Sequence, residues 1–555
     1  GTFEYSNGNV YKGEYRHNKW DGKGSFTYSR GDKYDGSWKD GKMDGSGVFS
    51  HSNGDKYDGS WKDDYRNGFG TLTIENGDVF SGEWLDGMLT GAGKYQYNNG
   101  DIYEGEFLKG IYNGDGIFSF SNGDVFTGNW KNDKMDGIGR MNYSNGNIYE
   151  GEWTDGLIHG DGTFTFSNGD VYEGEFINDL MSGYGRYQYS NGDSYQGMYL
   201  NGLKSGYGIY THKNNDTYSG NWLNDHKENF GVFIYKSNGS QYDGEWRTGL
   251  KSGQGSYLYS NGDVYEGSWK NDKKDGMGEC FYSDGTRYLG KWVNGLKNGP
   301  GTLILKDMHK YIGFWENDKK HGSGTSLFPN GDKFSGEWEN DTWQGQGKFY
   351  YKNGQLKRSV YYASNFLQGE ENSYFSSGQI KEKTTYRSGK KTGPYEIWNA
   401  SARPEEKGLF IDDELHGMIQ RWYYTGASAS ITSYKAGILD GVMQVFTLSN
   451  RLKRELFYDK GKEIARFEYH DNGRFKRVII INDGELQYER KWSQSGLEET
   501  AERFITGTRM NSDFYLSGIL KYECIYKGKS KHGMEWWFDE TRNPTKINLF
   551  LKKWF

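Results

Sequence analysis

Apolar and polar residues alternate along the first two-thirds of the chain in short stretches that are typical of β-strands. In residues 32–38, Tyr34, Gly36 and Trp38 alternate with polar residues. Successive side chains of a strand point to opposite faces of a sheet, so this segment predicts one aromatic and one polar face. Residues 1–350 show no helical periodicity. The pattern therefore predicts an all-β protein.

The alternating stretches recur with a period of 23 residues. Each copy has a Tyr-x-Gly-x-Trp core, whose middle residue we call the central glycine, and a later Gly-x-Gly pair. The step between Gly220 and Gly244 is 24 residues, and there Asn229 replaces the first glycine of the pair. A fixed period of this length marks tandem structural repeats. The fifteen central glycines are Gly13, Gly36, Gly59, Gly82, Gly105, Gly128, Gly151, Gly174, Gly197, Gly220, Gly244, Gly267, Gly290, Gly313 and Gly336.

Each copy reads as a strand, a loop, a returning strand and a turn. In the second copy we expect the loop at residues 39–44 and the returning strand at residues 45–49. The turn between copies is mostly Asn-Gly-Asp, as at Asn53-Gly54-Asp55. Asn-Gly predicts a type I′ hairpin turn, in which both central residues have positive φ. The central glycine leaves a slot between two rings, which we expect a ring of the neighbouring strand to fill.

These residues resemble the MORN (membrane occupation and recognition nexus) repeat, whose pattern is Tyr-x-Gly-x-Trp followed by Gly-x-Gly. The resemblance covers residues 1–350 and implies an elongated, curved, single-layer antiparallel β-sheet of tandem 23-residue hairpins. The last third keeps a similar period with a degraded pattern and resembles the MORN-variant repeats of bacterial proteins. We predict three segments: a regular MORN-repeat array (1–353), a degenerate MORN-variant array (354–546) and an apolar capping or docking tail (547–555).

Charge is distributed unevenly along the chain. Residues 354–555 carry 32 Lys and Arg against 26 Asp and Glu, a balance of +6, whereas residues 1–353 carry 36 against 49, a balance of −13. The acidic array should be repelled by nucleic acid and by anionic lipid. We therefore expect no nucleic-acid partner and no direct lipid binding through residues 1–353.

The sequence contains no motif that predicts an enzyme. It has neither a Gly-x-Ser-x-Gly nor a His-Glu-x-x-His segment, and Gly528-Lys529-Ser530 lacks the first glycine of a phosphate loop because Glu523 stands there. The many Gly-x-Gly pairs are repeat positions on strands. We predict no catalytic residues, no cofactor-binding residues and no cofactor.

Histidines and acidic loops were weighed as metal ligands. His159, His321, His416 and His532 each precede the first glycine of a unit, so their recurrence follows from the repeat. The loop at residues 133–137, like its equivalent at 272–276, holds two aspartates and a glycine, but a calcium site needs more oxygen ligands and turn chemistry explains these residues equally well. We predict no metal site.

The aromatic face supports two interpretations, which can hold together. In the first, its Tyr and Trp side chains form the core. In the second, some rings stay open as a binding groove, since such rings are favoured at interfaces. We predict a non-enzymatic scaffold that holds a protein partner along the concave aromatic face or at the basic carboxyl end. The resemblance implies a cytoplasmic location near cytoskeleton, cilium or membrane. The alternatives are a bacterial or cell-surface protein that binds a ligand or glycan, and a targeting arm for a separately encoded enzyme.

Overall fold

The computed structural model describes residues 1–503, 509–514, 520–527, 530–538 and 544–550. These residues form strands and turns and contain no helix, which confirms the all-β prediction. The chain divides into two compact units, residues 1–276 and 277–555, and β25 (Lys273–Phe281) spans the division.

The strands of the first unit are β1 Thr2–Glu4, β2 Val10–Arg16, β3 Lys19–Thr27, β4 Lys33–Lys39, β5 Lys42–Ser50, β6 Lys56–Lys62, β7 Tyr65–Thr73, β8 Val79–Leu85, β9 Met88–Gln96, β10 Ile102–Leu108, β11 Ile111–Ser119, β12 Val125–Lys131, β13 Lys134–Asn142, β14 Ile148–Thr154, β15 Leu157–Thr165, β16 Val171–Ile177, β17 Leu180–Gln188, β18 Ser194–Leu200, β19 Leu203–Thr211, β20 Thr217–Leu223, β21 His226–Tyr235, β22 Ser240–Arg247, β23 Leu250–Leu258 and β24 Val264–Lys270.

The strands of the second unit are β26 Arg287–Val293, β27 Leu296–Ile304, β28 Lys310–Glu316, β29 Lys319–Leu327, β30 Lys333–Glu339, β31 Thr342–Tyr350, β32 Leu356–Ala363, β33 Phe366–Leu367, β34 Gly369–Tyr374, β35 Ile380–Arg387, β36 Lys390–Trp398, β37 Pro404–Ile411, β38 Glu414–Trp422, β39 Ser428–Lys435, β40 Ile438–Phe446, β41 Leu452–Asp459, β42 Lys462–Tyr469, β43 Phe475–Asn482, β44 Glu485–Trp492, β45 Glu498–Arg503, β46 Arg509–Phe514, β47 Leu520–Lys527, β48 Ser530–Phe538 and β49 Pro544–Phe550.

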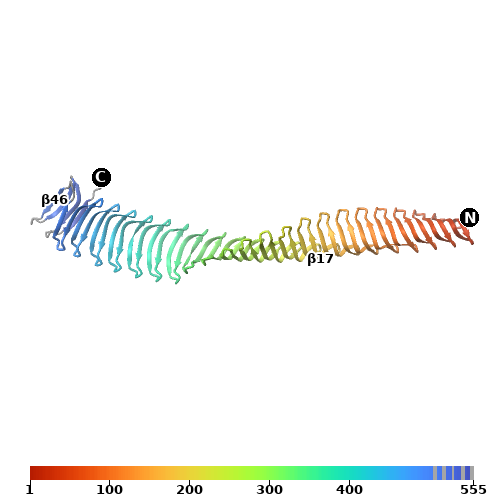
Figure 1. Cartoon of the computed structure of the whole chain (residues 1–555), viewed down its shortest axis with the longest axis horizontal. Helices are drawn as coiled ribbons and strands as arrows, with labels where there is room; N and C mark the ends of the chain where they lie inside the picture. Colours follow the sequence, from red (N-terminus) through yellow and green to blue (C-terminus); the bar gives the residue numbers. More distant parts are fainter. Residues whose placement is uncertain (504–508, 515–519, 528–529, 539–543, 551–555) are drawn as a thin grey trace. The chain divides into compact units, whose positions relative to one another are not determined.

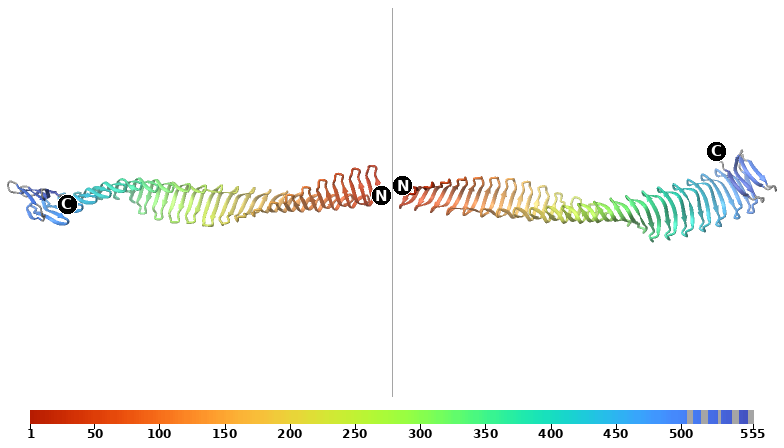
Figure 2. Two further views of the ribbon diagram at one scale, coloured as in Figure 1. Left: turned by 90° about the horizontal axis from the view of Figure 1, so that it is seen from above. Right: turned by 180° about the vertical axis from the view of Figure 1, so that it is seen from behind.

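Among the described residues all the pairings are antiparallel, and most strands are hydrogen-bonded to their neighbours in chain order (Figure 1). In the second unit β32 pairs with both β33 and β34, and β45 and β46 belong to different sheets. Each hairpin therefore lies beside the next, as the tandem repeat predicts. Two further views show a single layer of strands in the first unit (Figure 2). The predicted boundaries at residues 353 and 546 stay predictions.

The two ends of each hairpin have different turns, and the type I′ turn predicted at Asn-Gly is wrong. At the Asn-Gly-Asp end only Gly54 has positive φ; its N–H donates to the carbonyl of His51, and His51 N–H donates to the carbonyl of Asp55. This is a three-residue loop with a left-handed glycine. The type I′ geometry lies at the other end, where Asp40 (φ 51°) and Gly41 (φ 89°) are both left-handed.

That two-residue turn also corrects the predicted loop at residues 39–44. The returning strand β5 begins at Lys42, and Trp38 pairs with Met43 across the hairpin. The register shifts between Gly36 and Trp38, which marks a β-bulge. The first glycine of the pair, Gly45, lies opposite this bulge with a φ of 101°, a conformation that other residues adopt at a cost. In the irregular copy Asn229 adopts φ 56°, consistent with the tolerance of asparagine for the left-handed region.

The ring that covers the central glycine comes from its own strand and not from the neighbouring one. A Cβ added to Gly36 or Gly47 would lie 2.3–2.5 Å from atoms of the Tyr34 ring, so that ring lies flat across both glycines. The Tyr34 hydroxyl donates to the carbonyl of Ser37 at 3.0 Å. The glycines are therefore required by close approach, because any side chain would occupy the space of the ring.

Neighbouring copies are joined by side-chain hydrogen bonds as well as by the backbone ladder. Trp38 Nε1 donates to the carbonyl of Gly24 in the preceding copy at 3.0 Å. At one end of the hairpins a turn aspartate accepts the backbone N–H of the next turn, as Asp32 does from Ser52 at 2.8 Å. At the opposite end, Asp64 accepts the N–H of Met43 at 2.8 Å. Much of the acidic surplus of residues 1–353 therefore caps turns.

The second unit changes its core along the chain. Its later strands bury aliphatic residues such as Val360, Ile419 and Val478 in place of the regular aromatic rows. Strands β46 to β49 form a separate four-stranded sheet (Figure 1). Trp536 of that sheet packs on Trp492 of β44, with ring centroids 5.3 Å apart. This contact covers the end of the hairpin ladder.

Candidate functional site

The aromatic face contains rings of two kinds. The tyrosines and tryptophans of the Tyr-x-Gly-x-Trp cores are buried, as Tyr34 (0% exposed) and Trp38 (4%) illustrate, so they form the core as expected. A second row stands at the end of each returning strand, just before the turn between copies, and is half-buried. We call it the edge row; in the first unit its aromatic members include Tyr28, Tyr97, Phe120, Tyr143, Phe166, Tyr189, His212, Tyr235 and Tyr259.

One residue per copy varies near the two-residue turn, at the end of the hairpin opposite the edge row. It stands seven residues after the central glycine and pairs across the hairpin with the residue in the tryptophan position, as Met43 does with Trp38. We call it the variable position. Its occupants are Trp20, Met43, Arg66, Leu89, Tyr112, Met135, Ile158, Met181, Lys204, Lys227, Lys251, Lys274, Lys297, Lys320 and Trp343.

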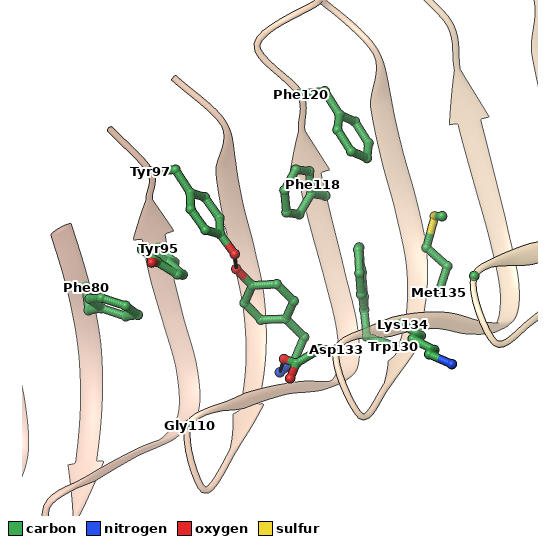
Figure 3. A pocket seen from close by; sticks show the side chains of 12 residues that line it. Phe80, Tyr95, Tyr97, Gly110, Phe118, Phe120, Trp130, Asp133, Lys134 and Met135 are labelled. Carbon is green, nitrogen blue, oxygen red and sulfur yellow. Dashed lines mark hydrogen bonds between the residues drawn. The ribbon is translucent and has the colours of Figure 1, made fainter. Parts of the chain in front are cut away.

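A pocket of about 570 Å³ opens on the aromatic face of the first unit between β8 and β15 (Figure 3). We call it the aromatic pocket. Aromatic rings form most of its lining, and Met135 adds a flexible apolar side chain. Its lining residues are Phe80, Tyr95, Tyr97, Gly110, Tyr112, Phe118, Phe120, Trp130, Asp133, Lys134, Met135 and Gly156. The volume and apolar lining suit the insertion of one or two large side chains.

The pocket exists because Phe80 departs from the repeat. In the copy of Phe126 the ring lies over its glycines, within 2.4 Å of a Cβ added to Gly139. The side-chain atom nearest to a Cβ on Gly82 would instead be Cδ1 of Leu89, 3.3 Å away, and the Phe80 ring is not among the three nearest neighbours. Leu89, only 3% exposed, occupies the space above Gly82.

The displaced Phe80 ring starts a stack that lines one side of the pocket. Its centroid lies 3.7 Å from that of Tyr95, which lies 3.8 Å from that of Tyr97. The rings of Phe80, Tyr95 and Tyr97 follow one another from β8 to β9 and its end in the close view (Figure 3). Offset stacks of this kind hold aromatic side chains in one orientation.

The polar groups of the pocket are tied into hydrogen bonds. The hydroxyls of Tyr97 and Tyr112 bond to each other, and Tyr95 donates to Asp78 at 2.8 Å. Asp133 accepts the backbone N–H of Tyr112 at 2.7 Å. Burial raises the pKa of Tyr112, and the bond from Tyr97 raises it further. These phenols stay protonated at neutral pH, so they can donate or accept hydrogen bonds but cannot act as bases there.

The candidate metal ligands whose side chains the structure describes have separate partners, and the side chain of His532 lies outside the described residues. Asp133 and Asp272 cap turns, since Asp272 accepts the backbone N–H of Lys251 at 2.9 Å. His321 faces Glu316 at 3.4 Å, and His416 lies near the backbone of Ala436. In the part of the chain that the structure describes, no three His, Cys, Asp or Glu side chains converge. The same residues include no long apolar helix of the kind that spans a membrane.

Sequence reasoning missed the variable position and the aromatic pocket. The variable position could have been found, because writing the copies under one another shows a run of uncharged residues, interrupted by Arg66, followed by six consecutive lysines from Lys204 to Lys320. The pocket depends on the orientation of Phe80, and Phe126 stands at the same point of the repeat with its ring buried. Residue type alone does not separate the two.

Comparisons with known proteins identify the repeat. A family model described as MORN repeat matches the fifteen segments 11–33, 34–56, 57–79, 80–102, 103–125, 126–148, 149–171, 172–194, 195–217, 218–240, 242–264, 265–287, 288–307, 311–333 and 334–356. No curated protein matches the chain.

Similar solved structures overlap with the chain only loosely. One is the TCP domain of SAS-4 (dCPAP) of Drosophila melanogaster in complex with a proline-rich motif of Ana2 (dSTIL), at 16% identity, 32% of this chain, 90% of that chain and a TM-score of 0.20. Another is the TCP10 domain of CPAP of Danio rerio, at 9% identity, 53% of this chain, 99% of that chain and a TM-score of 0.12. A streptogramin B lyase follows at 12% identity, 55% of this chain, 89% of that chain and a TM-score of 0.10.

Proposed function

The chain belongs to the MORN-repeat family, and on that basis we propose that it is a non-enzymatic scaffold whose aromatic face holds a segment of a partner protein. The aromatic pocket is the docking point. Its occupant is an apolar stretch of the partner that inserts one or two large side chains beside Tyr97 and Phe120.

The observation that carries the proposal is the open stack of Phe80, Tyr95 and Tyr97. A closed copy buries its first ring over the two glycines, whereas this copy leaves a cavity of about 570 Å³ lined by rings. Tyr and Trp are over-represented among the residues that dominate binding energies, because they bury a large area at a low entropy cost. The hydroxyls of Tyr97 and Tyr112 would orient a backbone or polar group of the bound segment.

The chemistry of the face supports binding more than catalysis. Burial raises the pKa values of the pocket phenols Tyr95, Tyr97 and Tyr112, and Asp133 accepts a backbone N–H. Family membership supports a cytoplasmic scaffold near cytoskeleton, cilium or the cytoplasmic side of a membrane. Extended arrays of this kind place several binding segments along one surface, so the chain can hold parts of an assembly in a fixed order.

Site-specific photocrosslinking in cells tests the proposal. A benzoylphenylalanine replaces Tyr97 in the pocket or, as a matched control, Phe230, which is 64% exposed on the opposite face. We expect one protein to crosslink through position 97 and not through position 230, with the adduct mapping to an apolar segment. Equal crosslinking at both positions, or recovery of only a glycan or small ligand from the pocket, would contradict the proposal and favour the surface-protein alternative.

A further inference from the structure

Lysines occupy the variable position in consecutive copies of the array. In the first unit they are Lys204, Lys227, Lys251 and Lys274, which we call the lysine row. The same position of the second unit holds Lys297 and Lys320. The copies before them carry mainly apolar residues there, among them Met43, Met135 and Met181. The change falls on the aromatic face, whereas the turn aspartates stand at the hairpin ends.

The lysines of the row lie among rings. Lys204 Nζ lies 5.5–5.6 Å from the ring centroids of Tyr189, Tyr195, Tyr210 and Trp222. Lys227 Nζ lies 4.4 Å from the ring of Phe233 and 4.7 Å from that of Trp246. Aromatic faces attract cations, and the long alkyl stems cover the core beneath them. This packing holds each ammonium group at a defined place along the face.

Carboxylates neutralise the row only in part. Lys204 lies 3.7 Å from Asp225. Among the described residues, no carboxylate forms an ion pair within 4.0 Å with the Nζ of Lys227 or of Lys251. Asp272 lies nearby, yet its Oδ1 accepts the backbone N–H of Lys251. Burial lowers the pKa of Lys227 to about 8 and lowers that of Lys251. An anion bound above the row would pair with these ammonium groups.

The distance between neighbouring lysines of the row determines which backbone conformation of an anionic peptide can place a carboxylate above each lysine. Neighbouring lysines are two strands apart, which is about 9.6 Å. A polyproline II helix repeats every three residues over about 9.3 Å, so side chains at every third position stay in register with the row. An α-helix offers a seven-residue repeat of about 10.5 Å, which drifts by about 3 Å over the three steps. An extended strand presents every second side chain at about 6.7 Å and does not match.

We propose that the lysine row is the docking strip for an acidic polyproline II segment of a partner protein that carries a carboxylate at every third residue. Rings beside each lysine would contact the prolines, as aromatic grooves do in proline-rich recognition. The inference rests on the proposed function in placing a partner on the aromatic face. It concerns different residues from the aromatic pocket and a different ligand chemistry.

Binding of synthetic peptides to the full chain tests the proposal. The probe is fluorescently labelled (Pro-Pro-Glu)5, measured by anisotropy at low salt. The control peptides are (Pro-Pro-Gln)5 and an isomeric peptide of the same composition with its five glutamates in one block. We expect (Pro-Pro-Glu)5 to bind at least tenfold more tightly than either control. Equal affinity of the blocked isomer would overturn the spacing argument, and failure of all peptides would overturn the proposal.

The matching protein variants are Lys227→Met with Lys251→Met, and Lys19→Met with Lys42→Met. The first pair replaces two of the four lysines of the row with methionine, a residue that the array itself uses at this position, so folding should be kept. The second pair removes the same charge from the exposed lysines beside Asp40 and Asp63. We expect a loss of at least tenfold for the first pair and less than twofold for the second. Similar losses would show that net charge alone drives binding and would overturn the site.

Two further measurements distinguish the peptide proposal from membrane binding by the lysine row and from partner binding by the aromatic pocket. Binding of phosphatidylserine vesicles in place of the peptide, lost with the same lysine variants, would assign the row to a membrane and overturn the peptide proposal. Crosslinking through position 97 should continue in the lysine variants, because the aromatic pocket is a separate site. Crosslinking that fails in the wild-type chain, together with normal peptide binding, would contradict the proposed pocket function alone.

Discussion

Phe80 stacks on Tyr95 with the two ring centroids 3.7 Å apart, and this contact replaces the burial that the repeat gives to its first ring elsewhere. Two residues of this copy, Phe80 and Leu89, explain the different position of the ring. Phe80 lacks the hydroxyl that holds Tyr57 to the carbonyl of Ser60, and Leu89 fills the space above Gly82. The stack of Phe80 on Tyr95 at one side of the aromatic pocket is therefore a property of one copy and not of the repeat.

Restoring the common residues should close the pocket. In the double variant Phe80→Tyr and Leu89→Met, the new hydroxyl can donate to the carbonyl of Glu83, and the unbranched methionine frees the space above Gly82. We expect crosslinking through position 97 to fall at least fivefold while the melting temperature stays equal or rises. The control is Phe126→Tyr, where the ring already lies over its glycines and crosslinking should not change. Undiminished crosslinking in the double variant, with a ring shown by a crystal structure to lie over Gly82, would contradict the pocket.

The repeat made most of the fold predictable, since period and alternation together determine which residues share a face. The turns were assigned to the wrong ends because Asn-Gly is compatible with two loop types, and the hydrogen bonds of His51 select the three-residue one. The bulge after Gly36 was missed because a register shift leaves no mark in residue type. The pocket was missed because Phe80 and Phe126 differ only in their surroundings, which become visible once Leu89 is placed.

Trp130 should stabilise its own copy and the next few strands rather than the whole chain. Its ring is 6% exposed and lies 5.3 Å from Tyr103 and from Phe126, so Trp130→Ala should cost about 3 kcal/mol through lost burial and a cavity. In an array each copy contacts only its neighbours, so limited proteolysis should cut near residues 120–140 and spare both flanks. Tyr207→Ala, at a site 59% exposed, serves as the control. Cooperative unfolding of the whole chain would contradict local packing.

The glycines beneath the tyrosine rings should tolerate no side chain. A Cβ on Gly47 would lie 2.3 Å from the Tyr34 hydroxyl oxygen, so Gly47→Ala should displace the ring and cost about 1–3 kcal/mol. Gly41→Ala is the matched control, because nothing lies within 4 Å of its Cβ and only its positive φ is strained. Urea denaturation monitored by tryptophan fluorescence gives both values. If Gly47→Ala proved as stable as the wild type, the flat placement of Tyr34 would be wrong.

Lys227 should make the stability of the array depend on alkaline pH. It faces Tyr218, Phe233 and Trp246, with Asp272 favouring its charge and Lys251 opposing it, and burial lowers its pKa from 10.5 to about 8. Between these two values the unfolded chain binds more protons than the folded chain, so unfolding becomes less favourable as the pH rises from about 8 to 10.5. As the pH rises over this range, the melting temperature of the wild type should therefore increase relative to that of Lys227→Met.

Chemical labelling of the amines checks the same pKa directly. At pH 8 Lys227 should react with acetic anhydride much faster per accessible amine than Lys42, whose pKa is raised by its hydrogen bond to Asp63. The rate of Lys227 should rise with pH and level off above about 9. A rate that keeps climbing to pH 10 would place the pKa at its ordinary value and remove the predicted pH dependence.

The four-stranded sheet should protect the end of the hairpin ladder in the second unit. Trp536, 1% exposed, packs with Trp492 and Phe475 in a cluster that includes Phe467, Val478 and Ile480. Without that cover, the cluster would expose a large apolar area at the last strands of the ladder, where unpaired strands invite aggregation.

Trp536→Ala should therefore cost about 3 kcal/mol and open β41 to β44 to proteolysis. A second variant lacks residues 547–555, of which 551–555, with Trp554, lie outside the described residues; it removes part of β49, whose backbone pairs with β48. We expect it to be less soluble and less stable in the same strands, while crosslinking through position 97 continues. This outcome supports a cap, because the damage follows the buried tryptophan. A soluble truncation of unchanged stability that loses its partner would instead make the tail a docking segment, since binding would then depend on residues that the fold does not need.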